Sequence, residues 1–405
     1  MRILQLCPKV PWPPDDGGRV AMRVLALSLL RAGAEVKTLC LNPAKHRVDA
    51  AGLPAEAGPL RLEAVDIDTS ITPLGALRGL RPGISYNVER FRSAAFERRL
   101  VEVLAAEPPD VVLLESLYMV PCAPVVRSAT RAPLVLRSAN VEHEIWDGLS
   151  RGERSPVRRL YLAHLGRRLR EYEIAALGAV DAIAAVTPED AEAYRRLGSR
   201  VPVRAVPVGL ETAAFPDRAG QGDPLTLTFL GSLDWRPNVE ALERFLDDAW
   251  PRVRRIVPLA RLLVAGSGAP GGLADRLRTE GVRFLGRVAD AHEFLASGAA
   301  MVVPLLSGGG VRVKILEAMA LGVPVVSTPL GASGIGAADG AEILLAEGAG
   351  PFADACATLL TDRDRAIAVG RAGRRHVRTC FDATEIGRGM LRWLDSLPDL
   401  DPVPA

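Results

Sequence analysis

Lys314 and Glu317 place a cation and a carboxylate three residues apart in an apolar segment that follows the glycines Gly308, Gly309 and Gly310. Side chains at this spacing lie on one face of a helix. The glycines can expose backbone N–H groups, and the helix after them turns the positive end of its dipole toward an anion. A carboxylate in such an apolar helix needs a polar partner. The segment therefore fits a nucleotide-sugar, with its diphosphate at the glycines and cations and its ribose hydroxyls on Glu317.

The same segment resembles the nucleotide-sugar motif of family-4 glycosyltransferases, which are retaining enzymes of the GT-B fold. Glu317 and the Ala-Met-Ala-x-Gly-x-Pro-Val-Val pattern that starts after it match the motif, whereas an earlier glutamate of the family would fall at Gly309 and is absent. The Gly-Gly-Gly-Val-Arg-Val-Lys version resembles a sub-branch associated with bacterial exopolysaccharide and cell-surface sugar transfer. The resemblance implies donor contacts from Gly309, Gly310, Val311, Arg312 and Glu317, and a catalytic charge on Lys314.

A second loop of the same kind follows the predicted strand 225–230. The strand ends at Gly231, and a short loop carrying Arg236 leads to a helix that we expect to begin near Asn238, a favourable N-cap residue. The resemblance implies that Gly231 and Arg236 contact the donor diphosphate, with Lys314 or Arg312 as the second charge. A solvent-exposed arginine is the alternative for Arg236.

Two more loops of the second half are donor candidates. Gly266 follows the predicted strand 262–265 in a Gly-x-Gly pattern, but no full Gly-x-Gly-x-x-Gly with a ribose-binding acid is present, which disfavours a dinucleotide oxidoreductase. Arg287 and Val288 follow the predicted strand 283–285, and they resemble the segment whose backbone contacts the nucleotide base.

In the first half, Gly17 and Gly18 lie between the predicted strand 3–6 and a predicted helix at 19–31. Open parallel sheets bind ligands at this position, although a tight turn is the alternative. The resemblance implies that the loop approaches both substrates, with Gly18 near the donor and Gly17 near the acceptor.

The predicted strand 134–136 runs into a polar loop in which relatives often read His-Asn-Val-Glu-His. The first of those histidines aligns with Ala139, and His143 remains, with acidic neighbours that can tune its charge. The resemblance implies that His143 hydrogen-bonds a donor-sugar hydroxyl or the acceptor, and that Asn140 and Glu142 position the acceptor. A surface histidine beside two acids is the alternative.

No metal or other cofactor is expected beyond the donor substrate. The five histidines lack the spacing of metal ligands. Asp66-Ile67-Asp68 and Asp362-Arg363-Asp364 mimic the Asp-x-Asp of metal-dependent transferases, but we interpret both as structural because the rest of that fold is missing. Transfer is therefore predicted to be metal-independent.

The domain organisation follows from length and alternation. A chain of 405 residues is too long for one ordinary core, and each half alternates short apolar strands with helices. We expect an α/β protein of the GT-B type, with two Rossmann-like domains facing a cleft. Residues 1–205 form an acceptor-binding domain, 206–380 a nucleotide-sugar-binding domain, and 381–405 a helix and tail that cross back to the first domain. The linker is expected at 201–216.

Composition limits the partners and the compartment. The net charge of +2 argues against nucleic acid, and five scattered cysteines indicate a reduced, cytoplasmic protein. No apolar run reaches the roughly 18 residues that span a bilayer, and the first residues do not read as a signal peptide. The segment from Arg151 to Arg170 is dense in arginine and contains leucines, so it can lie as an amphipathic helix on anionic lipid at the inner face of the membrane. A solvated face is the alternative.

These features together predict a hexosyltransferase that moves a sugar from a nucleotide-diphospho-sugar to a saccharide, lipid-linked or small-molecule acceptor. Two alternatives stay open. A catalytically degenerate binding or scaffold protein is favoured by Gly309 and Ala139, which stand where the family carries a glutamate and a histidine. A nucleotide-sugar epimerase on the same fold is the other.

Overall fold

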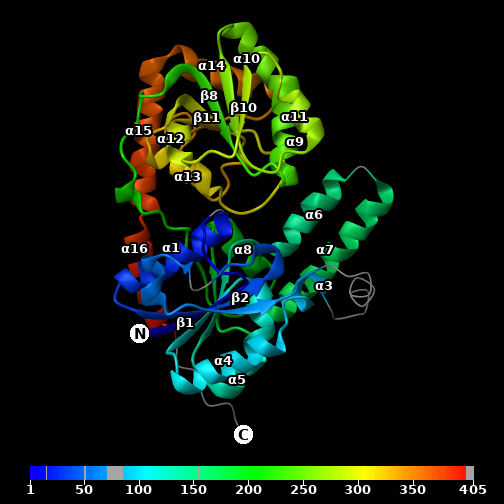
Figure 1. The fold of residues 1–405 in the computed structure, drawn as a ribbon, viewed down its shortest axis with the longest axis vertical. Coiled ribbons are helices and arrows are strands. Elements are labelled where there is room, and N and C mark those ends of the chain that lie inside the picture. Colours follow the sequence, from blue (N-terminus) through cyan, green and yellow to red (C-terminus); the bar gives the residue numbers. More distant parts are fainter. Residues whose placement is uncertain (15, 50–51, 71–84, 154, 398–405) are drawn as a thin grey trace. The chain divides into compact units, whose positions relative to one another are not determined.

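The computed structural model describes residues 1–14, 16–49, 52–70, 85–153 and 155–397, which form two compact units (Figure 1). Unit 1 holds Met1–Gly209 together with the C-terminal segment that starts at Ala383, and unit 2 holds Leu210–Asp382. Each unit is built on a parallel sheet with helices between most successive strands. The prediction of two Rossmann-like α/β domains is therefore confirmed.

The sheet of unit 1 has, in the described residues, seven parallel strands in the order β3-β2-β1-β4-β5-β6-β7. The order reverses between β1 and β4, and open sheets bind ligands beyond the carboxyl ends of the strands at such a switch point. Leu134 and Leu136 belong to one hydrophobic core and Val135 to another, so the inner strand β5 is buried on both faces. The strands are β1 (Arg2–Cys7), β2 (Glu35–Pro43), β3 (Glu63–Ile67), β4 (Val111–Glu115), β5 (Leu134–Ser138), β6 (Ala182–Ala185) and β7 (Val203–Ala205).

The C-terminal helix belongs to unit 1, where it packs along α1 (Figure 1). A Cβ atom on Gly387 would lie 2.6 Å from the backbone oxygen of Ser28, so the close approach requires a glycine. The expected return of the terminal helix to the first domain is confirmed. The helices of unit 1 are α1 (Gly17–Arg31), α3 (Tyr86–Glu89), α4 (Ala94–Ala106), α5 (Ala123–Ala129), α6 (Glu142–Gly152), α7 (Pro156–Ala176), α8 (Pro188–Arg196) and α16 (Ala383–Asp395), with 3-10 turns at Ala44–His46, Ala55–Leu60 and Leu117–Cys122.

One strand lies where the sequence predicted a linker. Residues 201–216 were expected to connect the domains, but Val203–Ala205 pairs with β6 and adds the edge strand β7 to unit 1. The prolines around this short strand hid it, because they are typical of linkers as well as of edge strands.

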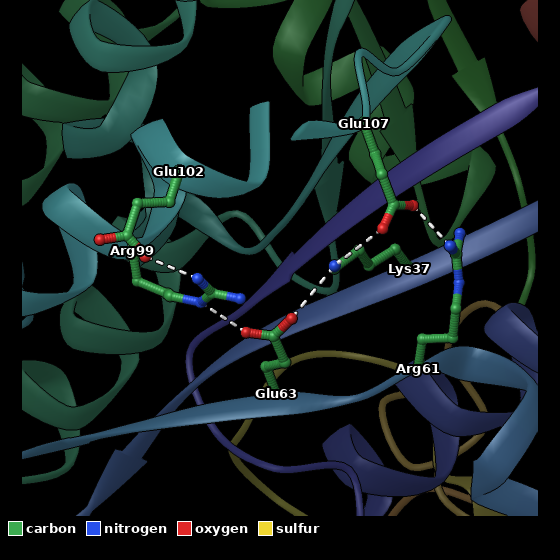
Figure 2. Close-up of polar contacts among 6 residues, drawn as sticks. All are labelled: Lys37, Arg61, Glu63, Arg99, Glu102 and Glu107. Carbon is green, nitrogen blue, oxygen red and sulfur yellow. Dashed lines mark hydrogen bonds and ion pairs between the residues drawn. The ribbon is translucent and has the colours of Figure 1, made fainter. Parts of the chain in front are cut away.

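An ion-pair network holds α4 against the edge of the unit 1 sheet, near the amino ends of its strands (Figure 2). Lys37 on β2 contacts Glu63 at 3.1 Å and Glu107, just after α4, at 3.3 Å. Arg99 on α4 donates to Glu63 at 2.6 Å, and these two cations hold the pKa of Glu63 below its usual range. Ion pairs that are partly open to solvent each contribute little to the free energy of unfolding. We therefore regard this network as an aid to the register of α4 at the amino ends of the strands, away from their carboxyl ends.

The sheet of unit 2 has, in the described residues, six parallel strands in the order β10-β9-β8-β11-β12-β13. The strands predicted at 225–230, 262–265 and 283–285 are present as β8, β9 and β10, and β13 is an additional strand at Leu344–Leu345 that pairs with β12. A strand this short leaves no alternating pattern for sequence analysis to detect. The strands are β8 (Asp223–Leu230), β9 (Arg261–Ala265), β10 (Val282–Gly286), β11 (Gly298–Val303), β12 (Val325–Ser327) and β13 (Leu344–Leu345).

Helix α13 of unit 2 carries the predicted donor motif, and most of its side chains are buried. Val313, Ile315, Leu316, Ala318, Met319 and Ala320 are all buried. The helices are α9 (Arg236–Arg244), α10 (Trp250–Ile256), α11 (Gly271–Arg276), α12 (Ala291–Ala296), α13 (Val313–Ala320), α14 (Ala349–Thr361) and α15 (Arg363–Cys380), with short turns at Thr212–Ala214 and Phe245–Ala249. Within the described ranges of both units, no helix is long and apolar enough to cross a membrane.

Candidate active site

The glycine run before α13 forms a tight loop after strand β11. Gly308 and Gly310 have φ angles of +107° and +77°, which residues with side chains rarely adopt. A Cβ atom on Gly308 would lie 2.8 Å from the ring of Trp235, so the loop packs too closely on that ring for a larger residue. The chain then enters α13 at Val313, with Arg312 at the N-cap position. The loop therefore presents the positive end of a helix beside a cation.

Arg312 is held over this loop with part of its guanidinium unsatisfied. Its Nη1 atom donates to the carbonyl oxygen of Gly310 at 2.7 Å and to that of Gly309, and its guanidinium lies 5.3 Å from the ring centre of Trp235. Burial lowers the pKa of Arg312 to about 10. Its Nε and Nη2 atoms are buried and have no hydrogen-bond partner among the described residues. An anion at this position would supply the missing acceptors.

Lys314 and Glu317 lie on α13 as predicted, and Glu317 has a partner that the sequence did not indicate. The Nε2 atom of His292 lies 4.0 Å from a carboxylate oxygen of Glu317, and this contact raises the pKa of His292. Asp290 caps α12 through the backbone amide of His292, which fixes the start of that helix. Burial lowers the pKa of Lys314, and the charge of Glu317 opposes this effect. No spacing in the sequence links His292 to the motif, because the contact exists only where α12 packs on α13.

Two predicted donor glycines, Gly231 and Gly266, lie against each other. A Cβ atom on Gly266 would lie 1.8 Å from the backbone oxygen of Gly231. A Cβ atom on Gly231 would lie 2.8 Å from the side-chain amide of Asn238. Both glycines are therefore required for the close packing of the chain after β8 and β9, whether or not a ligand contacts them.

The predicted loop around Arg236 is a helix instead. Helix α9 begins at Arg236 itself, and the side chain of Asn238 donates to the backbone oxygen of Ser232 rather than capping the helix. Arg236 donates to Glu240 one turn later at 2.7 Å, and its side chain is 48% exposed. The expectation of an N-cap at Asn238 was wrong because Pro237 favours the first turn of a helix and starts it earlier.

The remaining donor candidates are more accessible. Arg287 is exposed and Val288 half-buried, and both follow the end of β10 at Gly286. Val311 is partly buried and packs against the core beneath α13. If the backbone of this segment contacts the nucleotide base, its side chains contribute little to that recognition. The contact between this segment and the base therefore stays a prediction.

In unit 1, Gly17 and Gly18 are the first two residues of α1 and not a free loop. Asp16 caps the helix by accepting from the backbone amide of Arg19 at 3.0 Å. Lys9 in turn contacts Asp16 at 2.6 Å. A Cβ atom on Gly18 would lie 3.2 Å from the Asp16 carboxylate. The predicted start of this helix at residue 19 was wrong, because two consecutive glycines in a sequence are more typical of a loop than of the first turn of a helix.

His143 lies in the first turn of α6, directly after the carboxyl end of β5, and is only 6% exposed. Its Nδ1 atom lies 2.7 Å from Glu173 on α7, and its backbone amide donates to the same carboxylate at 3.2 Å. The backbone amide of Glu142 and the hydroxyl of Tyr194 also donate to Glu173, at 3.1 and 2.7 Å. His143 is therefore a buried, oriented histidine, which excludes the alternative of a surface histidine.

Glu142 and Asn140 belong to the same cluster. Burial raises the pKa of Glu142 to about 7, and the charge of Glu173 acts in the same direction. Tyr118 donates to Glu142 at 3.0 Å and opposes the shift. The backbone oxygen of Asn140 accepts from Ser138 at 2.6 Å, which shapes the loop between β5 and α6.

A buried ion pair lies below this loop and was missed by the sequence analysis. Arg137 donates to Glu115 at 2.9 Å, and both side chains are 2% exposed. Gln5 donates to the same carboxylate at 2.8 Å. Arg137 lies on β5, Glu115 is the last residue of β4, and Gln5 lies on β1, so the three meet near the switch point of the sheet. Parallel strands bring them together in space, and no local pattern records that proximity.

The basic segment 151–170 is not one helix. It spans the end of α6 and most of α7, which pack side by side as a hairpin (Figure 1). Arg154 lies outside the described residues. Near the start of α7, Val157 is 79%, Leu160 75% and Tyr161 45% exposed. The expected single amphipathic helix was wrong because Pro156 starts a new helix, but basic and exposed apolar side chains do share this part of the hairpin.

The two Asp-x-Asp segments are structural. Asp66 accepts from Asn42 at 2.8 Å and also pairs with Arg47. Asp362 caps α15 by accepting from the amide of Arg365 at 2.9 Å. Among the described residues, no three His, Cys, Asp or Glu side chains cluster as metal ligands would.

Both units match models of glycosyltransferase domains. Residues 16–209 match a glycosyl transferase 4-like domain, and residues 224–362 match the group 1 glycosyl transferases. Over 209 aligned residues the chain is 33% identical to a GDP-mannose-dependent α-(1-6)-phosphatidylinositol monomannoside mannosyltransferase of Mycobacterium tuberculosis, covering 44% of this chain and 52% of the relative. A GDP-mannose-dependent monoacylated relative from Corynebacterium glutamicum is 31% identical, with 50% and 58% covered. The chain thus spans little more than half the length of these curated relatives.

Solved structures agree on the fold. A sucrose-phosphate synthase from Thermosynechococcus elongatus superimposes with a TM-score of 0.73 at 17% identity, over 98% of this chain and 99% of that one. Anabaena HepE, solved in complex with UDP-glucose, superimposes with a TM-score of 0.68 at 16% identity, over 98% and 100%. With two parallel-sheet units on this fold and glycosyltransferase domains matched in both, the chain belongs to the family-4 glycosyltransferases of the GT-B fold.

Proposed function

We propose that the chain transfers a sugar from a nucleotide-diphospho-sugar to a saccharide, lipid-linked or small-molecule acceptor, with retention of configuration and without a metal. Residues 206–380 would bind the donor and residues 1–205 the acceptor. The observation that carries the proposal is Arg312, whose Nε and Nη2 atoms have no partner among the described residues although they are buried. Such donors cost about 1–3 kcal/mol each when left unsatisfied, and a diphosphate offers acceptors for both.

The chemistry of transfer requires charge neutralisation, because the nucleoside diphosphate leaves as an anion. Arg312, Lys314 and the N-terminus of α13 supply positive charge around the glycine loop. Glu317, further along the same helix, is a suitable acceptor for ribose hydroxyls. Arg236 fits this role less well, since its guanidinium is engaged by Glu240.

Calorimetric titration with nucleoside diphosphates tests the donor site. We expect wild-type protein to bind one of them, and Arg312→Gln to weaken that binding by about tenfold or more, the scale of a lost charged hydrogen bond. Arg255→Gln, on the exposed face of α10, is the matched control and should bind like wild type. Equal affinity in wild type and Arg312→Gln would contradict this donor site.

GDP-mannose and UDP-glucose are the donors to test first. GDP-mannose appears in the names of the two mannosyltransferases above, and UDP-glucose was bound in the HepE structure. A thermal-shift screen over nucleotide-sugars identifies the preferred donor, because a ligand stabilises the folded state according to its saturation. Transfer to labelled acceptors should then follow the same preference.

The scaffold alternative is supported by Ala139 and Gly309, which replace a histidine and a glutamate of the family pattern. A scaffold would bind the nucleotide-sugar and turn nothing over, and an epimerase would convert it without an acceptor. If wild type transfers no sugar and Ala139→His does, the chain is a catalytically degenerate binding protein, as the scaffold alternative states. Product analysis with and without acceptor separates the epimerase.

Peripheral membrane contact at the cytoplasmic face fits the exposed start of α7. Val157 and Leu160 are 79% and 75% exposed, and Arg158 and Arg159 lie between them on the exposed surface. Apolar side chains flanked by arginines suit an anionic bilayer, where burial and charge attraction add. A lipid-linked acceptor would then be reached from the membrane.

Co-sedimentation with vesicles tests this contact. We expect binding to vesicles with anionic phospholipid but not to neutral ones, and a loss of binding in Leu160→Ser. Leu259→Ser removes a leucine of unit 2 that is 72% exposed and should leave binding unchanged. Equal binding by Leu160→Ser and wild type, or self-association through this surface in solution, would contradict the proposal.

A further inference from the structure

We infer that Glu173 is a positioning residue, which holds the imidazole of His143 in the tautomer whose Nε2 atom accepts a hydrogen bond from a sugar hydroxyl. The inference deepens the proposed transferase function and rests on it. Glu173 lies on α7, thirty residues from His143 in the sequence, and nothing in the local pattern links the two.

The hydrogen bonds around Glu173 fix the proton on the ring. Its side chain is completely buried. One carboxylate oxygen accepts from the Glu142 amide and the Tyr194 hydroxyl, and the other accepts from the His143 amide and lies 2.7 Å from the Nδ1 atom of His143. Each carboxylate oxygen thus accepts from a backbone amide, which can only donate, and we infer that the carboxylate is the acceptor toward Nδ1 as well. The proton of a neutral imidazole therefore lies on Nδ1, and the lone pair lies on Nε2.

The remaining ring nitrogen is available. Among the described residues, Nε2 of His143 has no hydrogen-bond partner, while Nδ1 of the ring and the backbone amide of His143 both contact Glu173. A lone pair on Nε2 accepts from a hydroxyl and cannot donate. A sugar hydroxyl can donate or accept, so the fixed tautomer sets the hydroxyl in the donor role before the substrate arrives.

The hairpin gives this arrangement its rigidity. Gly166 on α7 lies so close to α6 that a Cβ atom there would be 2.9 Å from the carboxylate of Asp147. The two helices are therefore in direct contact along the hairpin, and Glu173 is held at a set distance from the start of α6. Loss of the carboxylate would free the ring to rotate or to change tautomer.

Two variants of Glu173 test the inference in the full chain. Glu173→Ala removes all four acceptor contacts, and Glu173→Gln keeps one oxygen that can still accept from His143. We expect kcat to fall by about a hundredfold in Glu173→Ala and by about tenfold in Glu173→Gln, with the KM for the donor within about twofold of wild type. Glu171→Gln, on the exposed side of α7 and paired with Arg168, is the matched control and should keep full turnover.

Ring nitrogen NMR of His143 gives a readout that does not need activity. At a pH where the ring is neutral, we expect wild type and Glu173→Gln to show Nδ1 protonated and Nε2 unprotonated. A protonated Nε2 in wild type would overturn the inference, as would full turnover in both Glu173 variants. If Glu173→Ala does not fold, the turnover of Glu173→Gln and the tautomer of His143 measured by NMR still test the inference. A wild type that transfers no sugar contradicts the proposed function instead, and the tautomer then bears on Glu173 alone.

Discussion

The region around Arg312 and the region around His143 are organised in opposite ways. Arg312 has two buried nitrogens without partners among the residues that the structure describes, beside a glycine loop and a helix N-terminus. His143 is anchored by a carboxylate that accepts four hydrogen bonds from the protein. In our proposal an anion completes the first arrangement, whereas in the second the protein has already oriented the ring. We infer that one region supplies binding energy and the other supplies orientation, and mutations should separate these two contributions.

The largest expected effect is on turnover, from His143→Ala. Loss of an oriented hydrogen bond to a reacting substrate should lower kcat by about a hundredfold, because positioning contributes strongly to rate. Nucleotide affinity should stay nearly unchanged, since the proposed donor site lies in the other unit. Steady-state kinetics and calorimetry on the same preparations measure the two quantities.

His164→Ala is the control for this variant. It removes another imidazole of the same hairpin, from α7, and should retain turnover. If His143→Ala is as active as wild type, His143 has no catalytic part and the contrast between the two regions fails.

Glu317→Ala should have the opposite signature. Removing the proposed ribose ligand should weaken nucleotide binding by about 1–3 kcal/mol, the range of a hydrogen bond to a charged group. Asp354→Ala, an exposed carboxylate on α14, serves as the control. Calorimetry that finds equal affinity for Glu317→Ala and wild type would show that this carboxylate does not touch the nucleotide.

The pH dependence of the free energy of unfolding should reveal the burial of Glu142. Its pKa is raised by burial to about 7, so the folded state holds a proton that the unfolded chain releases at lower pH. The resulting stabilisation is complete below the ordinary pKa and is lost as the pH rises through the raised one. The Gln side chain in Glu142→Gln is neutral at every pH. As the pH rises from about 5 to about 8, the free energy of unfolding of this variant should therefore increase relative to that of wild type by about 1–3 kcal/mol.

Denaturant unfolding at several pH values measures this difference. Asp190, whose burial raises its pKa to about 6, titrates in the same window but is present in both proteins and cancels. Parallel stability curves for wild type and Glu142→Gln would mean that Glu142 is charged and solvated, and that the His143 region is less closed than described.

A smaller effect is expected from Arg236→Ala. Because Arg236 pairs with Glu240 on its own helix and is half exposed, its loss should change nucleotide affinity by less than about 0.5 kcal/mol. A tenfold loss in calorimetry would show that Arg236 leaves Glu240 and joins the diphosphate site, as the sequence alone suggested.

No effect at all is expected from chelation. In the proposed donor site, Arg312, Lys314 and the start of α13 would provide the charge that a divalent cation supplies in other transferases. Turnover in EDTA should therefore equal turnover without it. Lost activity that magnesium or manganese restores would show that the cations of α13 do not suffice.

The sequence by itself determined the elements that depend on local signals. Apolar runs predicted the strands because a parallel sheet is buried on both faces, and glycines marked the loop before α13 because positive φ angles favour glycine. The resemblance around Glu317 led to the family that domain matches in both units then showed. Boundaries failed where two local signals compete, as at Arg236, where a proline at the first turn moved the helix start.

Only the tertiary structure decided which side chains meet. Glu173 reaches His143, His292 reaches Glu317, and Arg137 pairs with Glu115 through the packing of separate elements. The same packing decided that Arg312 keeps two buried nitrogens without partners in the described part of the chain, while Glu173 fixes the ring of His143 and leaves only its Nε2 atom open. Contacts between distant segments depend on how helices and strands dock, and a periodic pattern of hydrophobic residues specifies which face is buried but not which polar partner lies across it.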